Sequence, residues 1–159
     1  MIKQIFIGLV LIIPFTVSAQ EAEAINFKEK LIAITNGYFM AYNEHNVDKI
    51  IRFYDDSCVL IDANLKHEIR GKQKFRNVAR AAFEGTSPLY KDLFFKIYGM
   101  EQEGYKVIVK GEMQNLQWNR GYPESWRFVA HIQYNERGKI IEQKDFVEYP
   151  EDVFQYLKK

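Results

Sequence analysis

Two carboxylates and one phenol are the side chains of this sequence whose types and positions best fit chemistry. Asp62 ends a short apolar strand, Asp145 has the inward parity of the last strand, and Tyr38 lies on the apolar stripe of the first helix. A carboxylate near a phenol can take a proton from the carbon beside a carbonyl while the phenol stabilises the enolate. We therefore interpret Asp62, Tyr38 and Asp145 as candidate catalytic residues that converge in an apolar pocket.

Each carboxylate also has a structural interpretation. Asp62 can cap the turn at the end of its strand, and Asp145 can accept hydrogen bonds from Tyr or Trp side chains in a buried network. An acid on an apolar inner face needs such partners, because burying an unpaired charge is costly. From the sequence alone, both interpretations stay open.

Metal, nucleophilic and nucleotide chemistry find no support. His45, His67 and His131 fall at neither His-x-His nor His-x-x-x-His spacing, so no metal site is expected. Ser87 and Ser125 have no partnered histidine, and no glycine-rich phosphate loop occurs. We expect neither a metal nor a cofactor.

Composition favours one globular domain without a nucleic-acid partner. Of the 159 residues, 47% are apolar and 27% are charged, which excludes a disordered or fibrous chain. The 22 Lys and Arg residues nearly balance the 21 Asp and Glu residues, so no basic surface for nucleic acid is expected. The single Cys58 excludes an internal disulfide.

The first 19 residues have the pattern of a secretory leader. Lys3 precedes an apolar run over 5–17, and small residues close the segment at Ala19. The run is too short to cross a bilayer core, which needs about 20 apolar residues. We therefore expect cleavage before Gln20, a single domain over 20–159 with no membrane contact, and a periplasmic or secreted location.

Periodicity places three helices before a run of long strands. The expected helices cover 27–43, 47–54 and 72–83, the expected strands cover 58–62, 93–100, 105–117, 126–134 and 139–147, and a helical turn closes 150–157. Asn26 and Asn46 are the expected N-caps, and Gly85 is the expected C-cap of the third helix. Gly104 and Gly138 stand where hairpin turns need a positive φ.

This order of elements is typical of an α+β domain. We expect a cone-shaped, curved antiparallel sheet with the three N-terminal helices packed on its concave face, and a pocket between the two layers. The aromatic content of 15% fits a large apolar cavity. The side chains expected to contact a ligand are Tyr42, Tyr54, Trp126, Phe128 and Ala130.

Several short segments carry a family resemblance. They are Tyr-Phe-Met-Ala-Tyr-Asn at 38–43, Val-Asp-Lys-Ile-Ile at 47–51, Phe-Tyr-Asp-Asp at 53–56, Gly-Lys at 71–72 and the closing strand at 138–146. Together with the order of elements, they resemble the nuclear transport factor 2-like superfamily, in particular its SnoaL-like and ketosteroid isomerase-like branches. The resemblance covers essentially the whole chain after the leader and implies the cone-shaped fold, which serves many activities.

The resemblance also implies roles for single residues. Ketosteroid isomerases carry a tyrosine that donates to the substrate oxyanion and, 24 residues later, an aspartate that moves the proton; Tyr38 and Asp62 have this spacing. Gly71 matches the glycine that opens the third helix. Ala130 stands where these isomerases have a second acid, so steroid isomerisation is not assigned. SnoaL-like cyclases and epoxide hydrolases of the superfamily use a carboxylate in the region of Asp145.

Two functional hypotheses follow. The first is an exported, cofactor-independent acid/base enzyme of isomerase, cyclase or hydrolase type that acts on a small, largely apolar molecule with a carbonyl or epoxide group. The alternative is a non-catalytic ligand-binding or dimeric interaction domain on the same fold. Because family members commonly dimerise through the outer sheet face, we expect a homodimer there, with His131, Phe146 and Trp118 at the contact.

Overall fold

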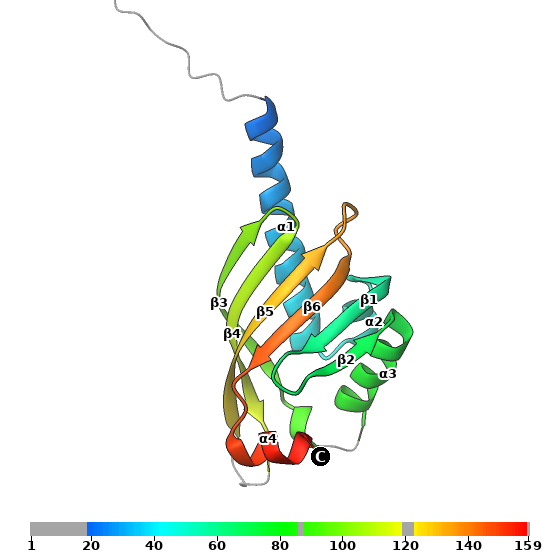
Figure 1. The fold of residues 1–159 in the computed structure, drawn as a ribbon, viewed down its shortest axis with the longest axis vertical. Coiled ribbons are helices and arrows are strands. Elements are labelled where there is room, and N and C mark those ends of the chain that lie inside the picture. Colours follow the sequence, from blue (N-terminus) through cyan, green and yellow to red (C-terminus); the bar gives the residue numbers. More distant parts are fainter. Residues whose placement is uncertain (1–18, 86–87, 119–122, 159) are drawn as a thin grey trace, which may run out of the picture.

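The computed structural model describes residues 19–85, 88–118 and 123–158 (Figure 1). In chain order the elements are α1 (Ala19–Asn43), α2 (Val47–Ile51), β1 (Tyr54–Asp62), β2 (His67–Arg70), α3 (Lys72–Phe83), the 3-10 turn η1 (Pro88–Tyr90), β3 (Phe94–Glu103), β4 (Lys106–Leu116), β5 (Glu124–Tyr134), β6 (Ile140–Val147) and α4 (Glu151–Leu157). Apart from Ala19, the expected leader lies outside the described residues. The expected α+β class is confirmed.

The described strands join one sheet in the order β2-β1-β6-β5-β4-β3. The strands β3 to β6 form the expected antiparallel meander. However, β1 runs parallel to β6, so the expectation of a wholly antiparallel sheet is wrong at this pair. Since β3 enters the sheet opposite in direction to β1, the three antiparallel pairings that follow bring β6 into the direction of β1.

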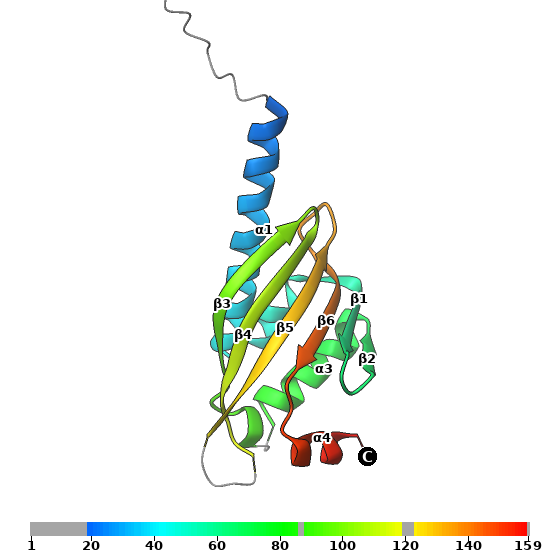
Figure 2. The same cartoon turned by 60° about the vertical axis from the view of Figure 1, so that its left-hand side comes forward.

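The helices α1, α2 and α3 lie on the concave side of the curved sheet, as expected. Figures 1 and 2 show α1 along β3 and β4, and α3 beside β1 and β2. The helix α4 lies at the end of the sheet toward which β6 runs. The core is therefore enclosed between the sheet and the first three helices.

The helix α1 begins earlier than the sequence pattern indicates. It starts at Ala19 rather than Phe27, so Asn26 lies inside the helix and is not its N-cap. The stretch before Asn26 is rich in Ala and Glu, which have high helix propensity and need no cap at that position.

In the middle of α1, the buried Thr35 hydroxyl donates to the Leu31 carbonyl at 2.8 Å and lies 2.7 Å from the Tyr134 hydroxyl.

The boundary between α2 and β1 also differs from the expectation. Asn46 is the N-cap, as predicted, and accepts from the Lys49 N–H at 2.9 Å. The helix ends at Ile51 instead of continuing to Tyr54, because the Ile140 N–H of β6 donates to the Phe53 carbonyl and draws the following residues into the sheet.

The helix α3 has the predicted bounds, and Gly71 opens it with a φ of 88°. Its C-cap is Glu84, and Gly85 does not adopt the left-handed conformation expected of a capping glycine. The polar segment before Gly71, expected as a connection, is the short strand β2, because it pairs with β1. Cys58 on β1 is fully buried, and burial raises the pKa of its thiol.

Of the three aromatic residues expected on the outer face of the sheet, two lie there and one does not. His131 and Phe146 lie there side by side, with ring centroids 5.2 Å apart. Trp118 instead belongs to the end of the molecule, where its ring contacts Tyr156 of α4 and its Nε1 donates to Asp152 at 3.3 Å. The formation of α4 therefore removes Trp118 from the expected dimer face.

Two turn glycines predict a measurable difference in stability. Gly104 and Gly138 have φ values of 55° and 71°, as the turn chemistry predicts. A left-handed residue other than glycine costs about 1–2 kcal/mol. A methyl group on Gly138 would also lie 2.8 Å from Ile34 Cδ1, whereas one on Gly104 would meet nothing within 4 Å.

We therefore expect Gly138→Ala to lower the free energy of unfolding in urea more than Gly104→Ala does. Gly104→Ala is the matched control, because it shares the backbone penalty and lacks the contact. Equal losses in the two variants would show that Ile34 moves aside and does not constrain the turn.

Candidate functional site

A cavity of about 280 Å³ opens between α3 and the concave face of the sheet. Aromatic and aliphatic side chains form most of its wall, and its carboxylates are Asp62 and Asp145. The aromatic residues of the wall are Tyr42, Phe75, Phe83, Tyr90, Phe95, Trp126 and Tyr149. The larger cavity is thus an apolar pocket with two acidic groups, and of the three expected catalytic residues Tyr38 does not line it.

A smaller cavity of about 70 Å³ lies deeper, toward α1. Tyr38, Phe128 and Gln143 line this cavity but not the larger one. Tyr42 and Asp145 belong to the walls of both. Asp145 therefore stands at the junction between an outer, wider space and an inner, narrower one.

The parallel pairing of β1 with β6 brings the two carboxylates together. Asp62 and Asp145 are direct partners in the register of these strands, and the Ala63 N–H donates to the Asp145 carbonyl at 2.8 Å. Neighbouring strands lie about 4.8 Å apart, and partners in register project from the same face of the sheet. The two acids are consequently adjacent and both face the larger cavity.

Asp62 has a structural role as well as a place in the wall. Its Oδ1 accepts from the backbone N–H groups of Asn64 and Leu65, at 3.0 and 2.8 Å. Its Oδ2 accepts a short hydrogen bond from the Tyr149 hydroxyl. The turn-capping interpretation of Asp62 is therefore confirmed, and the carboxylate is held in one orientation by three donors.

Asp145 is less well supplied with donors. The amide nitrogen of Gln143 lies 3.0 Å from each of its oxygens. Burial raises the pKa of Asp145 to about 7; the Gln143 hydrogen bond opposes this shift, and the nearby Asp62 charge adds to it. At neutral pH this carboxyl is thus present in both protonation states.

Gln143 links Asp145 to two buried tyrosines. Its Oε1 accepts from the hydroxyls of Tyr38 and Tyr54 at 2.6 and 2.8 Å, and the two hydroxyls lie 2.5 Å apart. Burial raises the pKa of both phenols well above the ordinary value, so both remain proton donors. Gln143 was not among the expected site residues, although its inward parity on β6 is the signal that could have found it.

The structure joins the three expected catalytic residues around Asp145 rather than around Asp62. Tyr38 is linked to Asp145 by hydrogen bonds through the Gln143 amide. Asp62 is the partner of Asp145 on the adjacent strand. Tyr38 and Asp62 line different cavities. The pairing of Tyr38 with Asp62 that the family resemblance implies is therefore replaced by a network with Asp145 at its centre.

Three of the five expected ligand-contacting residues line at least one of the two cavities, and two line neither. Tyr42 lines both cavities, Trp126 lines the larger and Phe128 the smaller. Tyr54 and Ala130 are fully buried but line neither of these two cavities. Tyr54 contributes to the site through its hydroxyl, and Ala130 pairs with Asp145 in the β5–β6 register, where its short side chain takes little space.

Three further side chains reach the larger cavity from segments that carry no periodic signal. Tyr90 belongs to η1, His67 to β2, and Tyr149 follows the end of β6.

Within the described part of the chain, no group of three or more His, Cys, Asp and Glu side chains is arranged to hold a metal ion. Nor is any described helix long and apolar enough to cross a membrane.

Solved structures with the same fold come from several bacteria. A candidate SnoaL-like polyketide cyclase from Shewanella denitrificans aligns with a TM-score of 0.66 and 17% identity, over 81% of this chain and 98% of the other. AclR, a candidate hydroxylase from Streptomyces galilaeus, aligns with a TM-score of 0.60 and 16% identity, over 82% and 87%. A candidate ketosteroid isomerase from Kribbella flavida aligns with a TM-score of 0.62 and 13% identity, over 77% and 80%.

At these identities the solved structures establish the fold alone. No curated protein matches the sequence significantly. The SnoaL-like domain family, however, matches residues 36–143, which include Tyr38, Asp62 and Gln143 and end two residues before Asp145. The matched range covers most of the described chain, and this protein therefore belongs to the SnoaL-like domain family.

Proposed function

We propose that this chain, exported after cleavage before Gln20, binds a small and largely apolar molecule in the larger cavity and acts on its carbonyl or epoxide group by acid/base catalysis without a cofactor. The observation that supports this most directly is the position of Asp145. It is a carboxyl group at the junction of two apolar cavities, with one amide donor among the described residues, whereas Asp62 beside it already accepts three hydrogen bonds.

The chemistry assigned to Asp145 follows from its surroundings. A group that titrates near neutral pH can both give and take a proton during one turnover. Gln143 donates to the carboxylate and so holds it while it is charged. Tyr42, whose pKa is raised chiefly by burial, lines both cavities and would donate to the oxygen that gains charge.

The alternative function is a non-catalytic ligand-binding domain. It is favoured by the engagement of Asp62 in a turn and by the closure of Tyr38 into a network with Tyr54 and Gln143. In that case the acids would hold a ligand without changing it. The two functions make different predictions for proton exchange.

We expect the protein to catalyse exchange of α-protons for deuterium when aryl and cyclic ketones are incubated with it in D₂O, as followed by proton NMR. Asp145→Asn should lower the exchange rate by about 10²-fold or more, the usual contribution of a positioned acid or base. Aryl epoxides in the same series report on the hydrolase type of activity.

Glu142→Gln is the matched control, because Glu142 is an exposed acid on the opposite face of the same strand. It should exchange at the rate of the unsubstituted protein. Ketones that bind to the protein but exchange only at the rate found in buffer, with epoxides that also stay intact, would contradict catalysis and favour the ligand-binding alternative.

The raised pKa of Asp145 predicts a distinctive pH dependence of stability. Between the ordinary value of 3.8 and about 7, the folded protein keeps a proton on Asp145 that the unfolded chain has lost. The contribution of this residue to stability therefore falls as the pH rises through that window and is constant above it. Urea unfolding at pH 5 and pH 8 measures the effect.

Asp145→Asn removes this titration and retains the shape of the side chain. From pH 5 to pH 8, the unsubstituted protein should lose more free energy of unfolding than the Asn variant does. Parallel pH profiles for the two proteins would show that Asp145 titrates in its ordinary range.

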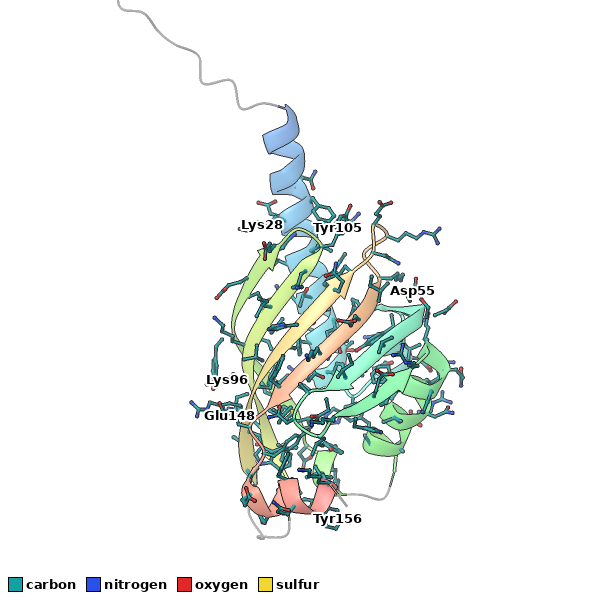
Figure 3. All side chains as sticks on the ribbon, viewed as in Figure 1. Lys28, Asp55, Lys96, Tyr105, Glu148 and Tyr156 are labelled. Atoms are coloured by element: carbon teal, nitrogen blue, oxygen red, sulfur yellow. The ribbon has the colours of Figure 1, made fainter. Side chains whose placement is uncertain are left out.

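We also propose that the outer face of the sheet is the contact between two copies of the chain. Tyr98 is 57% exposed and Phe146 is 38% exposed, and both border a surface hollow of about 280 Å³. Charged side chains surround this hollow, including Arg127 and Glu148, which form an ion pair at 2.8 Å. Figure 3 labels Glu148, which directly follows the end of β6.

Tyr98→Glu should shift the protein from dimer to monomer in light scattering at micromolar concentration, because a charge would be buried at the contact. Tyr156→Glu is the matched control: Tyr156 is 63% exposed on α4, away from this face (Figure 3). A monomeric unsubstituted protein, or equal behaviour of the two variants, would contradict the proposed contact.

A further inference from the structure

Among the described residues, the wall of the larger cavity carries negative charge and no Lys or Arg side chain. Asp62 and Asp145 face this cavity. The basic residue among the described lining residues is His67, which is exposed at the start of β2. An anionic ligand would therefore approach two acids without a permanent cation to receive it.

The two acids differ in how much hydrogen-bonding capacity they have left. A carboxylate offers about four acceptor positions. Asp62 already accepts from two backbone N–H groups and from Tyr149, whereas Asp145 accepts from the single amide of Gln143. A positively charged group that donates several hydrogen bonds would occupy the remaining acceptor positions of Asp145 and offset the repulsion between Asp145 and Asp62.

The remainder of the wall suits the same kind of ligand. Aromatic rings pack against one another around the cavity: Trp126 contacts Tyr149 with ring centroids 5.5 Å apart, and Tyr42 contacts Phe83 at 5.8 Å. Aromatic faces attract cations electrostatically and bury flat apolar surface. The wall therefore combines an apolar enclosure with an acidic end.

From this combination we infer that the ligand of the larger cavity is a cationic amine with a flat apolar body, whose ammonium group lies between Asp62 and Asp145. This inference rests on the ligand-binding step of the proposed function and narrows the class of ligand that is bound. The ammonium group replaces water at the two carboxylates, while the apolar body lies against the aromatic wall. A carboxylate in the place of the ammonium group would meet two like charges.

Three ligands that share an indole body and differ at the end of a two-carbon side chain test the inference. They are tryptamine, with an ammonium group; tryptophol, with a hydroxyl; and indole-3-propionate, with a carboxylate. Isothermal titration calorimetry at pH 8, above the usual titration range of histidine, measures the binding of each. We expect tryptamine to bind at least about tenfold more tightly than tryptophol, and indole-3-propionate to bind more weakly than tryptophol.

Asp145→Asn and Asp62→Asn should each reduce the preference for tryptamine over tryptophol, while binding of tryptophol reports that the cavity is still formed. Glu142→Gln should retain the full preference. Tryptophol binding with no preference for tryptamine would overturn the inference and leave the ligand-binding function standing. Failure of all three ligands to bind would overturn the inference together with the proposed function.

Discussion

The parallel pairing of β1 with β6 decides where both acids of the cavity stand. Because the register places Asp62 directly beside Asp145, two carboxylates from distant parts of the chain project from one face at the spacing of adjacent strands. A shift of β6 by one residue would turn Asp145 outward and bring Phe146 into the core. The Ala63 N–H bond to the Asp145 carbonyl fixes the pairing at the point where it matters most.

The orientation of the Gln143 amide fixes which groups around Asp145 donate hydrogen bonds and which accept them. Two phenols meet its amide oxygen, and phenols that stay protonated must donate, so the oxygen has to face Tyr38 and Tyr54. The amide nitrogen then faces Asp145 and presents it with hydrogens only. The hydroxyls of Tyr38 and Tyr54 and the Gln143 Oε1 make three short contacts with one another, and each phenol has one proton to donate. Both phenolic protons are therefore used inside this network, and neither is left to donate to the Asp145 carboxylate.

The sequence predicts those parts of the structure that depend on local periodicity. Helical spacing located α3 and the buried face that carries Tyr38, and alternation along β6 placed Asp145 inward. Long-range pairing is what the sequence does not reveal. The direction of β1 relative to β6, the conversion of Tyr54 from the end of a helix to the start of a strand, and the arrival of Tyr149 at Asp62 all depend on neighbours more than 80 residues away.

The cavity itself is a consequence of side-chain size along α3. Ala79 and Ala82 line the cavity between the larger side chains of Phe75 and Phe83, and their short side chains leave the space beside the middle of the helix open. Protein interiors are normally packed without voids, and a core that served stability alone would carry larger side chains there. Two carboxylates turned toward this same space make it costly to fill with apolar groups. The small residues of α3 therefore leave a space, and the paired acids of the sheet make that space unsuitable for apolar side chains. A ligand or water can occupy it.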